Sequence, residues 1–196
     1  MLMIACGAIA KELVALKELN GWHNLQIECL PADLHNAPAQ IVRAVRERLT
    51  QVRDRYDLVF VAYADCGTAG ALDQVLAEFK VERLPGAHCY EFFASKSEFD
   101  ALCQEELGSY FLTDFLVRHF DRLVWRGLGL DRHPELLTSY FGNYRRLVYL
   151  AQSVNPTLLG MAQQHARQLG LEFHLRYTGL TPLCNAMPQP VILHAT

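Results

Sequence analysis

The chain has 196 residues, which is enough for one domain with a buried core. It is 51% hydrophobic and 20% charged with a formal net charge of −3, so its composition is that of a soluble globular protein and lacks the basic character of nucleic-acid-binding proteins. No apolar run approaches the ~20 residues that cross a membrane, and no signal-peptide pattern opens the chain, so we expect a cytoplasmic protein that binds neither membranes nor nucleic acid.

The first half of the chain alternates between short apolar runs and amphipathic segments. It predicts strands at 1–5, 25–30, 58–62, 81–84 and 89–93, and helices at 9–20, 38–52, 72–79 and 95–107. The run Leu58–Ala62 is apolar at every position, as expected for a strand that is covered on both faces. Ser95 and Glu98 form a capping box for the last of these helices.

The second half begins with a longer helical pattern. A helix from about Thr113 ends at the glycines 127 and 129, and a second helix is predicted at 134–140, so we interpret 113–144 as a helical insert. Strands at 147–151 and 171–177 then flank a helix at 155–170, and the tail is expected to be irregular. The alternation predicts a single α/β domain over residues 1–196, with a mostly parallel sheet, helices on both faces in a doubly wound, Rossmann-like arrangement, and the helical insert.

Three of the six cysteines lie near predicted strand ends. In a reducing compartment six cysteines do not indicate a disulfide framework, and no CxxC pair encodes a local metal or redox site. Cys6 and Cys66 each follow an apolar strand and precede a glycine and a helix, which places them where open α/β sheets bind ligands and where a helix N-terminus is expected to lower a thiol pKa. Cys89 joins them if 81–84 is the strand and the segment around Cys89 is a loop. The sequence therefore predicts a metal site of Cys6, Cys66 and Cys89 that holds zinc or an iron–sulfur cluster. Glu91 is the expected further ligand, and His88, Asp65 and Asp114 are the other available ones.

Other polar residues near these cysteines are candidates for catalysis or cofactor binding. Asp65 and His88 neighbour two of the cysteines, and His133 belongs to a polar cluster in the insert that could close over the sheet as a lid. We take these three as candidate catalytic residues. His35 follows the second strand and is a candidate cofactor-binding residue at the same end of the sheet.

A second interpretation of the Cys66 loop needs no metal. Gly67, Thr68 and Gly70 open a helix, and their backbone N–H groups could bind an anion such as a phosphate. No lysine follows the glycines as in a Walker loop, and the GxGxxG spacing is absent, so this interpretation ranks below the metal site.

Several segments together resemble a bacterial and archaeal family known chiefly as a domain of unknown function. They are Ala5–Ala10, Leu34–Pro38, Asp65–Thr68, His88–Glu91, Phe111–Leu116, Gly129–Leu136 and Tyr140–Tyr144. The resemblance covers roughly Ala5 to Ala151, and Ala64 stands where the family usually has a glycine before the acid of its Gly-Asp-Cys-Gly motif. Members are often encoded near corrinoid-dependent methyltransferases that act on methylamines or betaines.

The resemblance implies a role in one-carbon metabolism but no established activity. Three functions remain as alternatives: a metal-binding protein of corrinoid-linked methyl transfer, enzymatic or not; a non-catalytic accessory protein or chaperone of a corrinoid or metal; and an anion-binding enzyme that uses the 67–70 turn. The expected partners are a small-molecule ligand and a corrinoid protein or methyltransferase.

Overall fold

The computed structural model describes residues 1–195 and divides the chain into two compact units. Unit 1 comprises Met1–Phe92 and the segment from Leu180 onward, and unit 2 comprises Phe93–Gly179. Both units contain parallel strands and helices, so the predicted α/β class is confirmed, but the strands form two sheets rather than the one sheet expected. No helix within residues 1–195 has both the length and the apolar character that a membrane span requires.

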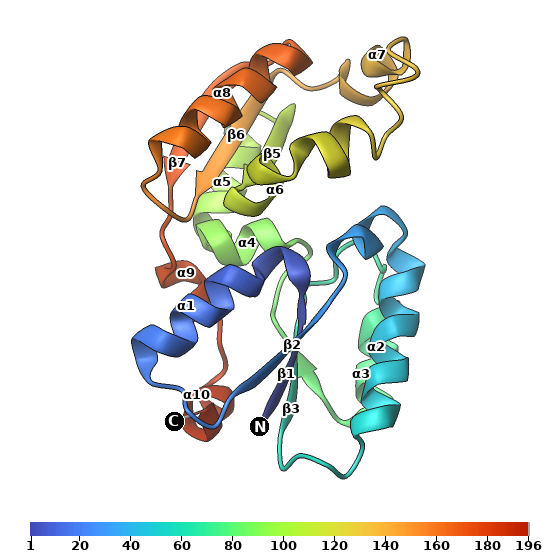
Figure 1. Ribbon diagram of the computed structural model, residues 1–196, viewed down its shortest axis with the longest axis vertical. Coiled ribbons are helices and arrows are strands. Elements are labelled where there is room, and N and C mark those ends of the chain that lie inside the picture. Colours follow the sequence, from blue (N-terminus) through green and yellow to red (C-terminus); the bar gives the residue numbers. More distant parts are fainter. Residues whose placement is uncertain (196) are drawn as a thin grey trace. The chain divides into compact units, whose positions relative to one another are not determined.

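Unit 1 is built on a four-stranded parallel sheet with the order β2-β1-β3-β4. The strands are β1 (Leu2–Cys6), β2 (Gln26–Leu30), β3 (Val59–Ala62) and β4 (Glu82–Arg83). The helical elements are η1 (Gly7–Ile9), α1 (Ala10–Asn20), η2 (Ala32–Asn36), α2 (Pro38–Val52), α3 (Ala71–Phe79), α4 (Cys89–Ala94), α9 (Thr181–Asn185) and α10 (Gln189–Ala195). Figure 1 shows α1 on one side of β1–β3 and α2 with α3 on the other. This is the doubly wound arrangement that the sequence predicts.

The hydrophobic pattern explains how unit 1 closes around its sheet. Every residue of β1 is buried, as is typical of a central parallel strand with helices on both faces. Helix α2 buries Ile41, Val45, Leu49 and Val52, whose spacing forms one stripe along the helix. Because all four strands are parallel, their carboxyl ends lie along one edge of this buried sheet.

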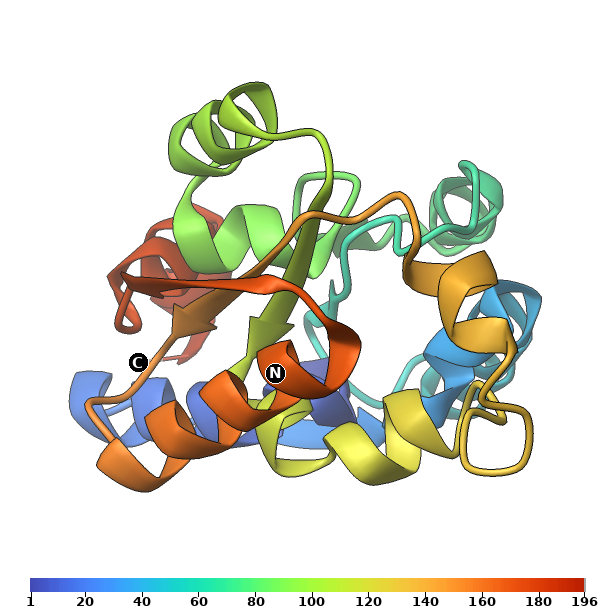
Figure 2. The ribbon, with the colours of Figure 1, turned by 90° about the horizontal axis from the view of Figure 1, so that it is seen from above.

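Unit 2 is built on a three-stranded parallel sheet with the order β5-β6-β7. Its strands are β5 (Ser109–Thr113), β6 (Arg146–Ala151) and β7 (Glu172–Tyr177), and its helices are α5 (Lys96–Glu105), α6 (Asp114–Arg118), the π-helical segment η3 (Asp121–Trp125), α7 (Leu136–Phe141) and α8 (Pro156–Leu169). Figure 2 shows α8 and α6 on the same side of these strands, with α5 on the other side. The predicted insert 113–144 contains α6, η3 and α7 and connects β5 to β6.

Three local predictions are wrong. Residues 89–93 form most of α4 and not a strand, because the Glu91 carboxylate accepts hydrogen bonds from the backbone of Ala87 and His88 and so starts a helix. Strand β5 was not predicted, because it runs directly into α6 with Thr113 as the N-cap. The tail is helical, since α9 and α10 bury Leu183, Val191 and Ala195.

Candidate functional site

Three cysteines reach the carboxyl edge of the unit 1 sheet from three different strands. Cys6 is the last residue of β1, Cys66 follows β3, and Cys89 lies beyond β4 at the start of α4. Because the strand order reverses direction between β1 and β3, this is the switch point at which open α/β sheets bind ligands. The condition for including Cys89 is met only in part: the strand is β4, as required, but Cys89 begins helix α4 and does not lie in a loop.

The three sulfurs form one cluster, which we call the thiol cluster. Burial is the largest cause that raises the pKa of Cys6 and of Cys89, and Cys66 adds to both shifts, so the three thiols are near enough to influence one another's ionisation. Each sulfur also accepts hydrogen bonds from backbone N–H groups. The donors include Ala8 on Cys6 at 3.3 Å and the backbone of Cys89 on Cys66.

The environment favours protonated thiols in the absence of a metal. Burial raises the pKa of Cys6 to about 12 and that of Cys66 to about 11, and it also raises the pKa of Cys89. The expectation that a helix N-terminus lowers the thiol pKa is therefore wrong, because loss of hydration outweighs the backbone N–H groups. A cysteine nucleophile would need the opposite shift.

His35 and Tyr63 lie beside Cys6. Nδ1 of His35 is 3.6 Å from Cys6 Sγ and 3.1 Å from the carbonyl oxygen of Ala32. The imidazole stacks on the Tyr63 ring with an interplanar angle of 11°. The Tyr63 hydroxyl is buried and makes no hydrogen bond of normal geometry within residues 1–195, although it interacts with the Cys6 thiol. Tyr63 was missed from the sequence; the signal was a single polar ring in an otherwise apolar run.

The loop 65–70 positions Cys66, and several of its hydrogen-bond donors are bound to an acceptor within the loop. The Asp65 carboxylate accepts hydrogen bonds from the Thr68 hydroxyl at 2.8 Å and from the backbone of Ala69 and Gly70 at 3.1 and 2.9 Å. Burial acts to raise the pKa of Asp65, but these hydrogen bonds outweigh it and lower that pKa. Donors that an anion would need are thus already bound to Asp65, so the loop is poorly suited to phosphate.

The loop between β4 and α4 pairs with the Cys66 loop. The backbone N–H groups of Asp65 and Cys66 donate to the carbonyls of Gly86 and Ala87 at 3.1 and 2.9 Å. Glu91 braces this turn through two backbone hydrogen bonds, and a Cβ atom on Gly86 would lie 2.9 Å from a Glu91 oxygen. Glu91, predicted as a metal ligand, is therefore occupied with holding the turn.

The two predicted catalytic histidines are exposed. His88 stacks on Tyr90; burial lowers the pKa of His35, and the nearby His88 adds to that shift. His133 lies in unit 2, in the turn before α7, where it is paired with Glu135 at 3.1 Å. Within residues 1–195, no group of three or more His, Cys, Asp and Glu side chains has an arrangement that could hold a metal ion. The donor types of the thiol cluster thus suit a metal, whereas their present side-chain positions do not form a coordination sphere.

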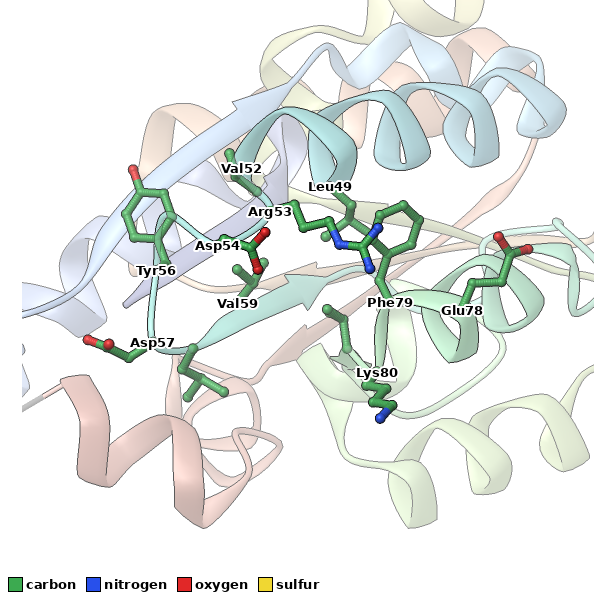
Figure 3. Close-up of a pocket in the computed structure, with 12 residues that line it drawn as sticks. Leu49, Val52, Arg53, Asp54, Tyr56, Asp57, Val59, Glu78, Phe79 and Lys80 are labelled. Carbon is green, nitrogen blue, oxygen red and sulfur yellow. The ribbon is translucent and has the colours of Figure 1, made fainter.

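A pocket of about 370 Å³ lies at the opposite, amino-terminal end of the unit 1 sheet. Figure 3 shows it between the ends of α2 and α3, with Arg53 beside Asp54 and with Asp57 and Lys80 on opposite sides. The helix C-termini favour cations, and basic residues at such positions are common complements of the helix dipole. The charges of both signs select no ligand class, so the pocket is a weaker candidate site.

Unit 2 holds a buried carboxylate, Asp114, at the corresponding end of its own sheet; the sequence offered it as a fourth metal ligand, but it lies in the other unit from the three cysteines. The Asp114 side chain accepts hydrogen bonds from the Tyr149 hydroxyl at 2.7 Å, from the backbone of Gln152 at 3.1 Å and from the Ser153 hydroxyl. Arg118 lies 3.8 Å away. This network joins α6 to the end of β6, and both oxygens of its carboxylate accept hydrogen bonds.

Comparison with known proteins gives a family but no activity. No curated protein and no solved structure matches the chain. A model of the family described as "Protein of unknown function (DUF1638)" matches residues 29–187, a range that includes Cys66, Cys89 and His35. Since the match covers most of the sequence, the chain belongs to the DUF1638 family of proteins of unknown function.

Proposed function

We propose that the thiol cluster binds a metal, as Zn²⁺ or an iron–sulfur cluster, in a protein of corrinoid-linked one-carbon metabolism. The observation that carries the metal proposal is the convergence of Cys6, Cys66 and Cys89 from three strand ends, with backbone N–H groups directed at the sulfurs. Such hydrogen bonds stabilise anionic sulfur and tune metal–thiolate centres. The pathway and a corrinoid protein or methyltransferase as partner rest on the family resemblance alone.

Metal binding requires two changes from the metal-free arrangement. The thiols must lose their protons, because only thiolates are metal ligands, so binding releases protons and tightens as the pH rises. The side chains must also move into coordination geometry, which staggered rotamers about each Cα–Cβ bond permit. The raised pKa values argue against a cysteine nucleophile and leave the metal role as the one that the donor set suits best.

Elemental analysis of protein purified without air tests the proposal. We expect about one zinc, or several iron atoms with inorganic sulfide, per chain, and a loss of the metal in Cys66→Ser. The matched control is Cys29→Ser, since Cys29 is an exposed cysteine that should not affect the metal content. A brown protein supports iron–sulfur, and a colourless protein supports zinc. Metal that is absent from the wild type, or unchanged in Cys66→Ser, refutes the proposal.

The accessory alternative is separated by a different measurement. A pull-down with the corrinoid protein, run beside methyl-transfer turnover assays, distinguishes a binding protein from an enzyme. Capture without turnover supports the accessory role, and turnover that depends on Cys66 supports an enzyme.

A further inference from the structure

We infer that strand β7 pairs with the β7 strand of a second copy of this chain, so that the unit 2 sheets of the two copies join in a symmetric dimer. This inference goes beyond the proposed function and does not depend on a metal. Strand β7 has β6 on one side, and no strand pairs with its other side within residues 1–195 (Figure 1). An unpaired strand edge presents free backbone N–H and C=O groups, and a strand from another chain can satisfy them.

The hydrogen bonds to β6 show which backbone groups of β7 face the open edge. The N–H groups of Glu172 and Thr178, at the two ends of β7, donate to backbone carbonyls in and next to β6 at 3.0 and 2.9 Å. Backbone groups alternate in direction along a strand, so the even-numbered residues face β6. Phe173, Leu175 and Tyr177 therefore direct their N–H and C=O groups to the open edge.

The open edge also carries exposed apolar side chains. Leu175 and Tyr177 are 42% and 61% exposed, and they share a face of the strand with Phe173, which packs against the core beside α8. In contrast, four of the five residues of β5, the strand at the opposite edge of this sheet, are buried. An exposed apolar strand with free backbone groups is a site at which sheets associate, so β7 is the edge that a partner would cover.

The sequence of β7 is complementary to itself when two copies run antiparallel. A two-fold axis through His174 pairs Phe173 with Leu175 of the partner subunit, and both are residues whose backbone groups face outward, so they exchange two hydrogen bonds. On the other face, the same register places Glu172 opposite Arg176 of the partner subunit, and the symmetry repeats this pair. A shift of the register by two residues in either direction removes the charge pair.

The contacts that these side chains already make are compatible with the pairing. Arg176 donates to the Leu175 carbonyl at 3.2 Å, an exposed contact that an N–H group of the partner would replace. Glu172 lies 2.9 Å from His174, and 75% of its side chain is exposed, so its carboxylate can accept a second partner. Charges protect a strand edge when like charges meet, whereas the two-fold axis brings opposite charges together. This complementarity favours a second copy of the chain over a strand of another protein.

Sedimentation equilibrium of the full chain over a concentration series tests the inference. We expect the wild type to approach twice its chain mass of 22.2 kDa. Glu172→Arg and Arg176→Glu should each weaken dimerisation by at least about 10-fold, because each places like charges together at both symmetry-related pairs. The double variant restores opposite charges and should dimerise as the wild type does. The control Glu47→Arg reverses an exposed charge on α2 of unit 1 and should leave dimerisation unchanged.

Cross-linking tests the position of the axis. Facing residues that do not exchange hydrogen bonds in an antiparallel pair have Cα atoms about 4.5 Å apart, which is within disulfide range. In a background without the exposed Cys29, His174→Cys should therefore form a disulfide-linked dimer on mild oxidation, whereas Glu172→Cys, two residues from the axis, should not. A wild type with the single-chain mass at every concentration overturns the inference. A dimer that is unaffected by both charge reversals, or that His174→Cys does not cross-link, also overturns it.

Discussion

Cys66 adopts a backbone conformation that its side chain disfavours, and this can be measured. Its φ is +51°, in the left-handed region, whereas Cys6 has φ −70°. The left-handed conformation costs a residue with a Cβ atom about 1–2 kcal/mol, and glycine escapes this cost. At a position with ordinary backbone angles, a glycine variant unfolds more easily than the alanine variant by about 0.5–1 kcal/mol, because glycine loses more backbone entropy on folding. Where the alanine methyl group is buried, its loss adds about 0.8 kcal/mol to this difference.

The two cysteines therefore predict different glycine-for-alanine comparisons. At Cys6, glycine should be less stable than alanine by about 1–2 kcal/mol. At Cys66, relief of the strain should nearly cancel that penalty, so Cys66→Gly and Cys66→Ala should agree within about 0.5 kcal/mol. Both pairs remove the sulfur, so the comparison is independent of any metal when a chelator is present.

Urea unfolding measures the free energies. The chain has two tryptophans, and Trp22 is buried in unit 1 whereas Trp125 lies in unit 2, so a Trp125→Phe background lets fluorescence follow unit 1. If the difference in free energy of unfolding between the glycine and alanine variants is equal at Cys6 and Cys66, the reasoning is refuted. Backbone strain would then give no support for a functional Cys66. Strained residues cluster at functional sites, so the predicted difference would support one here.

Three further predictions concern the polar networks. Asp65→Ala should lower the free energy of unfolding of unit 1 by about 2 kcal/mol, because the Asp65 carboxylate accepts hydrogen bonds within its loop. The control Asp57→Ala removes an exposed carboxylate and should change that free energy by less than about 0.5 kcal/mol. In unit 2, a double-mutant cycle of Asp114→Ala and Tyr149→Phe in urea should give a coupling energy of about 1–3 kcal/mol; additive effects would contradict the hydrogen bond. Burial lowers the pKa of His165, so as the pH falls the unfolded chain takes up this proton before the folded chain does. The free energy of unfolding should therefore decrease as the pH drops below about 6.5. His165→Phe should reduce this pH dependence by up to about 1.4 kcal/mol per pH unit, as measured by urea unfolding followed by circular dichroism.

Regularity along the chain made part of the fold and site predictable. The apolar runs at β1 and β3 are buried strands, and a glycine after each cysteine signalled the turn at the strand end. Parallel strands bring their carboxyl ends to one edge, so Cys6 and Cys66 could be paired from chain position alone. These inferences needed only local patterns and one rule of topology.

Side-chain contacts and burial, which spacing along the chain does not record, explain what could not be predicted. Residues 89–93 have the aromatic composition of a strand, but the Glu91 side chain caps a turn and starts a helix. The position of Tyr63 beside Cys6 depends on side-chain packing that no spacing records. The direction of the thiol pKa shifts depends on burial, which is a property of the whole unit, and a local helix N-terminus therefore misled the prediction.

The polar groups at the two sheet edges differ in a way that indicates where ligand chemistry takes place. In unit 2 the Asp114 carboxylate has hydrogen-bond donors for both oxygens, so adding a ligand would break bonds that the fold already uses. In unit 1 backbone N–H groups donate to the sulfurs, and the Tyr63 hydroxyl has no hydrogen-bond acceptor of normal geometry among residues 1–195. Ionisation of the thiols would strengthen every one of these contacts, and a bound cation is what makes that ionisation favourable in a buried site. The proposed metal role therefore predicts that the polar groups at the edge of unit 1 gain stronger hydrogen bonds when a cation binds, whereas those of unit 2 would lose theirs.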